Sequence, residues 1–135
     1  MPKRRKRGLV HADLTLRGPG GEAKLTRVLV DTGSSYTWVP ETLARRLGAR
    51  EREIIPLELA DGNIVHRMLA EIEVEILNRR GTRFIVFGHK KDSTLIGVDT
   101  LEGLRLEIDP VRHRLRLAAT ALAVSSRSAP EPAAA

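Results

Sequence analysis

The chain contains no cysteine and few aromatic residues, and no apolar run in it approaches the ~18 residues that a membrane span requires. Without cysteine, disulfides, thiolate nucleophiles and cysteine-ligated metals are excluded. With aromatics at 3% and Trp38 the only tryptophan, a base-stacking surface is not expected. No apolar segment follows the basic N-terminus to make a signal peptide, so the sequence predicts a soluble, cytoplasmic protein.

The net charge of +6 is mostly local. Lys3 to Arg7 are all basic, and the rest of the chain carries 18 basic against 17 acidic residues. We expect residues 1–8 to be a disordered basic tail that aids solubility; attraction to nucleic acid, an anionic membrane or an acidic partner is the weaker alternative. Residues 118–124 are small and apolar, and 125–135 are rich in Ser, Pro and Ala, which predicts a disordered end.

Between the tails, residues 9–117 read as one domain of β-strands. From Val10 to Leu16 apolar and polar residues alternate strictly, which predicts a half-buried strand. The Gly18–Gly21 segment predicts a turn, and Ala23–Val30 the return strand that leads into Asp31. Later strands are expected at 82–87, 94–97, 105–109 and 115–117.

Two further features are local. A short helix should follow Pro40 and end at Gly48, because apolar residues recur at helical spacing between them. Asp61-Gly62 between two extended runs predicts a tight hairpin, whose return strand Ile64–Ile76 is long.

The segment that follows the second strand carries the chemistry. Asp31-Thr32-Gly33 stands at the end of an apolar β-branched strand, where glycine permits a sharp turn. This loop resembles the catalytic loop of aspartic peptidases. The longer match, which continues as Ser-Ser-x-x-Trp-Val-Pro, resembles the version found in two-lobed pepsin-like enzymes.

Such catalysis needs two carboxylates facing one water, yet Asp-Thr-Gly occurs once and the chain is about half the length of a two-lobed enzyme. A two-fold homodimer, in which each subunit supplies one Asp31, solves this problem. That architecture is typical of the retropepsin-like (retroviral-type) family. Leu95-Ile96-Gly97 followed by a short helix near Asp99 is similar to its second hallmark, and the resemblance spans about residues 9–117.

The resemblance implies an all-β fold: a closed, mainly antiparallel acid-protease barrel with one or two short helices. It implies an aspartic endopeptidase that acts on peptides or proteins without a metal or cofactor. The catalytic residues it implies are Asp31, Thr32, Gly33 and Ser34. The substrate-binding residues, in a flap and beside the catalytic loop, are Ala60, Asp61, Gly62, Asn63, Ile96 and Gly97.

Roles follow from the resemblance as well. Two Asp31 carboxylates would share a proton, Thr32 would lock the two loops together across the dimer axis, and Gly33 amides would orient the carboxylates. Ser34 would donate a hydrogen bond to Asp31, which favours an acidic pH optimum and a Ser34→Ala profile moved toward neutral pH.

The sequence also departs from the viral pattern. The expected flap tip is not glycine-rich, and Ser35 and Val98 stand where viral enzymes carry an interacting acid and arginine. The charged N-terminus is a poor strand, so Leu115–Val124 is expected to contribute more to the dimer.

Other chemistries find little support. The four histidines (His11, His66, His89 and His113) lack metal-ligand spacing, and Asp99 is expected to cap a helix. One alternative function stays open: a catalytically silent domain of the same fold that dimerises or binds peptides.

Overall fold

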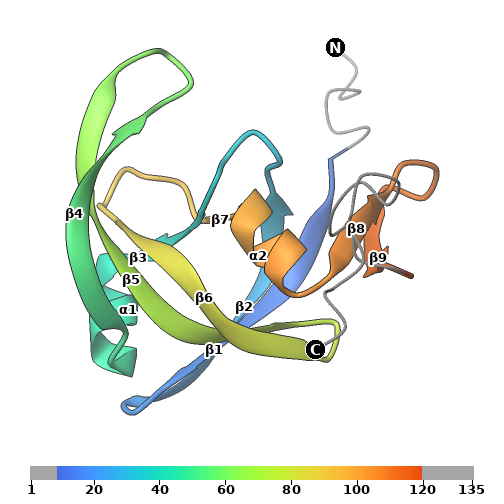
Figure 1. Cartoon of the computed structure of the whole chain (residues 1–135), viewed down its shortest axis with the longest axis horizontal. Helices are drawn as coiled ribbons and strands as arrows, with labels where there is room; N and C mark the ends of the chain where they lie inside the picture. Colours follow the sequence, from blue (N-terminus) through green and yellow to red (C-terminus); the bar gives the residue numbers. More distant parts are fainter. Residues whose placement is uncertain (1–8, 120–135) are drawn as a thin grey trace, which may run out of the picture.

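A seven-stranded sheet makes up most of the computed structural model, which describes residues 9–119 (Figure 1). Its strands are β1 (His11–Gly18), β2 (Gly21–Val30), β3 (Thr37–Pro40), β4 (Arg50–Glu58), β5 (Ile64–Ile76), β6 (Arg79–Gly88) and β7 (Leu95–Ile96). The other elements described are the helices α1 (Glu41–Leu47) and α2 (Val98–Gly103) and a hairpin of β8 (Leu106–Asp109) and β9 (Arg114–Leu117). The predictions for residues 1–8 and 120–135 lie outside the described residues.

The order of strands in the large sheet is β1-β2-β7-β3-β6-β5-β4, and β1 also pairs with β5. Leu16 lies opposite Val74 in that extra pairing. The strand pairings therefore run from β1 around to β5 and back, with β4 added outside β5. The all-β expectation is confirmed, with two short helices in the described part of the chain. The closed barrel, which this circuit of pairings favours, and the homodimer stay predictions.

The first hairpin follows the alternation of the sequence. Leu14 and Leu16 are fully buried, while Asp13, directly before Leu14, is exposed. An irregularity in the pairing lies between Ala12 and Leu14, and Arg27 there takes a positive φ of 52°. The Asp13 carboxylate accepts a hydrogen bond from the Arg27 amide (3.1 Å), which satisfies a donor that the irregularity takes out of the ladder.

Helix α1 begins and ends where the sequence predicts. Pro40 lies at the N-cap, and Gly48 ends the helix in the left-handed conformation (φ 82°), where its amide donates to the Arg45 carbonyl (3.0 Å). No helix within residues 9–119 is long and apolar enough to cross a membrane.

Apolar side chains form two clusters. The larger one joins side chains of β1, β2, β5, β6 and both helices, and the smaller one is built on Trp38, Leu69 and Val86. Leu69 and Val65 lie on the face of β5 that later carries its glutamates, and both belong to this smaller cluster. The first half of β5 thus carries apolar side chains on both faces, beside His66 and Arg67, which its alternation alone did not predict.

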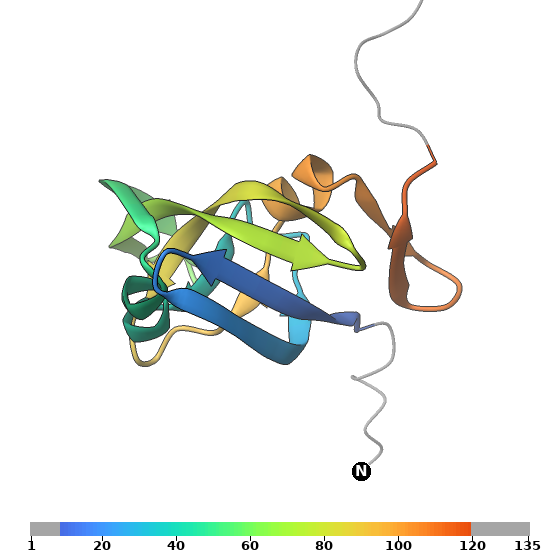
Figure 2. The ribbon, with the colours of Figure 1, turned by 90° about the horizontal axis from the view of Figure 1, so that it is seen from below.

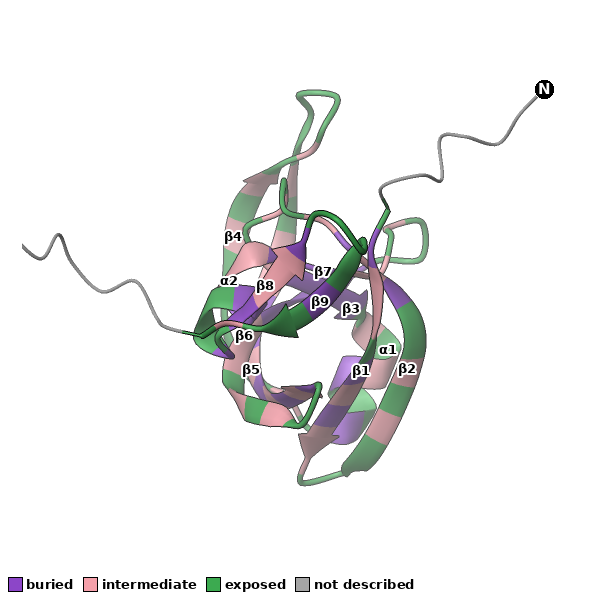
Figure 3. Ribbon diagram, turned by 90° about the vertical axis from the view of Figure 1, so that its right-hand side faces the viewer, coloured by how far each residue is buried: buried purple, intermediate pink, exposed green. Residues whose placement is uncertain are grey.

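The long β4–β5 hairpin extends away from the rest of the sheet, and its tip is exposed (Figure 3). At the tip, Gly62 takes a positive φ of 89° and its amide donates to the Leu59 carbonyl (2.9 Å). The Asp61 carboxylate accepts bonds from the backbone amide and the side-chain amide of Asn63, both at 2.9 Å. The Asp-Gly hairpin prediction is confirmed. The β8–β9 hairpin stands at the opposite end of the molecule (Figure 2).

Candidate active site

Asp31 is the first residue after β2. Val30 pairs in parallel with Ile96 of β7, and the Asp31 amide donates to the Ile96 carbonyl (2.8 Å). Val30 and Ile96 are buried, and Asp31 itself is half-buried. The strand therefore fixes the backbone of Asp31 while its carboxylate reaches the surface.

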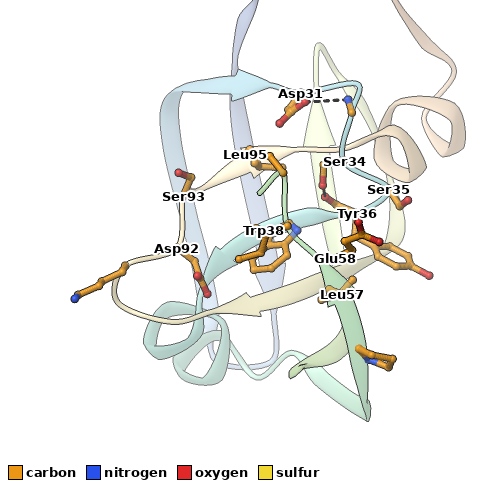
Figure 4. A pocket seen from close by; sticks show the side chains of 15 residues that line it. Asp31, Ser34, Ser35, Tyr36, Trp38, Leu57, Glu58, Asp92, Ser93 and Leu95 are labelled. Carbon is orange, nitrogen blue, oxygen red and sulfur yellow. Dashed lines mark hydrogen bonds between the residues drawn. The ribbon is translucent and has the colours of Figure 1, made fainter. Parts of the chain in front are cut away.

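The turn after Asp31 orients that carboxylate. The Gly33 amide donates to Asp31 Oδ1 (2.9 Å), as Figure 4 shows, and the Ser34 amide donates to the Asp31 carbonyl (3.1 Å). A Cβ on residue 33 would lie 3.2 Å from Asp31 Oδ1, so glycine lets the amide approach closely. The amide–carboxylate contact expected for Gly33 is present, and Thr32 and Gly33 are exposed at the tip of the turn.

The prediction that the Ser34 hydroxyl donates a hydrogen bond to Asp31 is wrong. The Ser34 hydroxyl donates instead to the Tyr36 carbonyl (2.7 Å), and a hydroxyl has one proton to give. The Tyr36 carbonyl lies in the loop before β3, and its donor is the Ser34 side chain, two residues earlier in the chain. The basis for an acidic optimum set by Ser34 is thereby removed.

The loop of residues 31–36 is held by the start of α2. The amides of Val98 and Asp99 donate to the carbonyls of Ser34 (2.8 Å) and Ser35 (2.9 Å). These amides are among the donors that a helix N-terminus leaves without intrahelical partners. A Cβ on Gly97 would lie 2.2 Å from the Tyr36 carbonyl oxygen, so only glycine lets this segment pass so close to the loop.

The expectation that Asp99 caps α2 is wrong as well. Gly97 is the N-cap residue and has no side chain to cap the helix, and the carbonyls of Ser34 and Ser35 accept the first amides instead. Asp99 lies inside the first turn and binds Arg83 of β6 through both oxygens, at 2.6 and 3.2 Å. Its role is to attach α2 to the sheet.

A cleft of about 750 Å³ opens beside the Asp31 carboxylate (Figure 4). It lies between the loop of residues 31–36, the end of β4 and the segment before β7. Its lining residues are Asp31, Gly33, Ser34, Ser35, Tyr36, Trp38, Pro56, Leu57, Glu58, Leu59, Ala60, Lys91, Asp92, Ser93 and Leu95.

The structure brings only some predicted site residues to this cleft. Of the six substrate-binding residues predicted, Ala60 lines it. The tip residues Asp61, Gly62 and Asn63 are exposed and do not line the cleft. Ile96 and Gly97 are buried behind the loop, where they support it and do not line the cleft.

Sequence reasoning missed most of the cleft wall. Trp38 and Tyr36 follow the loop directly, and the alternation of Leu57 and Leu59 at the end of β4 was a signal that these side chains share a face. Nothing in the sequence marked the 91–93 segment, because it reaches the cleft only through the parallel pairing of β2 with β7.

A strand-end carboxylate, an amide that orients it and a cleft beneath a long hairpin therefore lie together at this place in the fold. No group of three or more His, Cys, Asp or Glu side chains that could hold a metal occurs in residues 9–119. The family model described as gag-polyprotein putative aspartyl protease matches residues 21–103. The chain belongs to this family, and the retropepsin-like resemblance is confirmed. No curated protein matches the chain.

Proposed function

We propose that the protein is a homodimeric aspartic endopeptidase in which two Asp31 carboxylates, one from each subunit, activate a water. One observation carries the proposal: Asp31 is half-buried, oriented by the Gly33 amide and open to the cleft. Family membership supports peptide-bond hydrolysis as the reaction.

We infer that a second copy supplies the second carboxylate. The sequence holds one Asp-Thr-Gly, and Asp92, another acid of the cleft, is already bound by Arg67 at 2.8 and 3.3 Å. The exposed Thr32 and Gly33 supply a surface for the copy, beside a hollow of about 360 Å³ whose wall includes Glu102. Across a two-fold axis the same loop would meet itself.

The paired carboxylates share one proton, as like charges at close range do in aspartic proteases generally. The ionised carboxylate takes a proton from water while the water oxygen attacks the scissile carbonyl carbon, and the protonated carboxylate donates to the carbonyl oxygen. When the tetrahedral intermediate collapses, the C–N bond breaks and a proton passes to the leaving nitrogen. The products are a carboxylic acid and an amine, and no bond to the enzyme forms.

The Asp31→Asn variant tests the proposal. The full-length protein is incubated with a proteome-derived peptide library at several pH values, and cleavage sites are read by mass spectrometry. Wild type should cleave, and Asp31→Asn should lose at least about 1,000-fold in rate, because Asn cannot act as a base. Sedimentation and circular dichroism should show the same dimer and fold for both.

Asp13→Asn serves as the matched control, because it makes the same chemical change on β1, at a residue that does not line the cleft. It should cleave as wild type does. Proteolysis retained by Asp31→Asn would place the chemistry elsewhere. A wild type that cleaves nothing at any pH would favour the silent, peptide-binding alternative.

A further inference from the structure

The charged residues that line the cleft differ in whether another side chain already binds them. They are Asp31, Glu58, Lys91 and Asp92. Asp92 accepts hydrogen bonds from Nε and Nη2 of Arg67 and from the His89 amide (2.7 Å), and the Arg67 bonds hold its pKa below the ordinary value. Its charge is therefore compensated, and it has little left to offer a substrate.

Glu58 is different. It is the last residue of β4, it is exposed, and it makes no ion pair within residues 9–119. Figure 4 shows it across the cleft from Asp92, with Trp38 between them. A carboxylate in the cleft wall thus remains available to a bound peptide.

The surroundings of Glu58 suit a long cationic side chain. The cleft that Glu58 lines also carries the apolar and aromatic side chains of Tyr36, Trp38, Leu57 and Leu59. Lysine and arginine carry an apolar stem beneath their charge, and an aromatic ring also attracts a cation at its face. The stem can lie on the apolar wall while the charged end reaches the carboxylate.

We propose that Glu58 is a specificity-determining residue that selects peptides with Lys or Arg at the position beneath the end of β4. This inference rests on the proposed function, since it concerns the same cleft. Lys91 lines the cleft from the segment before β7, where it disfavours a second cation. The preference should therefore hold at one position of the peptide and not along its whole length.

The test compares wild type with Glu58→Gln and Glu58→Lys on a peptide library randomised around a common apolar cleavage site. Wild type should favour Lys or Arg over Gln at one position by about two- to fivefold in kcat/KM, the range of a solvent-exposed ion pair. Glu58→Gln should lose that preference, and Glu58→Lys should replace it with a preference for Asp or Glu. Raising the salt concentration should weaken all three effects.

Glu53→Gln is the matched control. Glu53 is an exposed residue of the same strand, has no ion pair in the described part of the chain and does not line the cleft. It should leave the profile unchanged. A wild-type profile without a basic preference at any position, or a Glu53→Gln shift as large as that of Glu58→Gln, would overturn the inference.

A binding arm separates this inference from the proposed function. Asp31→Asn protein, with and without Glu58→Gln, is titrated with a fluorescent peptide carrying one Lys and with its Gln-substituted partner. Tighter binding of the Lys peptide that Glu58→Gln abolishes supports the role of Glu58, even if no variant cleaves. Equal binding of both peptides contradicts it, whatever the cleavage assay shows.

Discussion

At the scale of single residues, two threonines hold the loop that carries Asp31. Thr37 and Thr100 are fully buried, and their hydroxyl oxygens lie 2.6 Å apart. Thr37 Oγ1 also accepts the Gly97 amide (3.0 Å). One side chain therefore joins β3, the segment before α2 and α2 itself. Neither threonine carries a signal in the sequence, because a threonine at the start of an apolar strand or within a short helix is ordinary.

We predict that Thr37→Val costs about 1–3 kcal/mol of unfolding free energy, because it leaves the buried Gly97 amide without an acceptor. Thr100→Val should cost less, since Thr37 still accepts that amide. Urea unfolding of the two variants and the double variant measures both costs and their coupling. Equal costs for the two single variants would show that the Gly97 amide does not depend on Thr37.

At the scale of elements, an ion pair joins the base of the β4–β5 hairpin to the wall of the cleft. Arg67 of β5 and Asp92 are bound through two contacts, with their side chains 13% and 14% exposed. Arg67 also donates to the His66 carbonyl (3.0 Å). Because Asp92 lines the cleft, this pair fixes the 89–93 segment relative to the hairpin.

We predict that Arg67→Gln lowers the unfolding free energy at neutral pH by about 1–3 kcal/mol, the range for hydrogen bonds to charged groups. The pair depresses the pKa of Asp92 below its ordinary 3.8. Its contribution is thus complete above that value and is lost as the pH falls through the lower, folded pKa. Thermal melts from pH 7 downward should show wild type and variant converging below about pH 3.8.

The exposed pair of Arg17 and Glu22 supplies the control. Glu22→Gln should change stability by less than about 0.5 kcal/mol at neutral pH, because solvent screens it. In the peptidase assay Arg67→Gln should raise KM more than it lowers kcat, since it loosens the wall and leaves Asp31 in place. An Arg67→Gln effect that persisted unchanged at pH 2–3 would contradict the role of Asp92.

Elements with local causes were predictable from the sequence. Gly48 ends α1, Asp61-Gly62 turns the hairpin, and Asp31 follows the apolar end of a strand, because each depends on residues within a few positions. The hydrogen bond of Ser34 was not, because two acceptors lay within its reach. Which acceptor the hydroxyl meets depends on the fold of the loop, which the distant amides of Val98 and Asp99 hold in place.

At the scale of the whole molecule, the unpredicted features are the non-local ones. The additional β1–β5 pairing, the smaller apolar cluster on Leu69 and the cleft wall at 91–93 all arise from contacts between distant segments. Dimerisation is also a property of this scale. Leu115, expected at the dimer contact, packs in the main core instead, and Leu117 of the same strand is exposed. A substitution of Leu115 would therefore destabilise the fold, and it would not be a specific test of dimerisation.

Mixing subunits tests the dimer without disturbing any interface. If each active site needs two Asp31 residues, a mixture with wild-type fraction f should retain activity in proportion to f², because random pairing makes heterodimers that hold one Asp and one Asn. Equal amounts of wild type and Asp31→Asn, unfolded and refolded together at constant total concentration, should then show about one quarter of the wild-type rate. An enzyme that works as a monomer would show about half. Differently tagged subunits, recovered together by affinity capture, verify that exchange occurred. A linear dependence on f in exchanged samples would contradict the shared site, whereas a quadratic one requires that both carboxylates act in a single reaction.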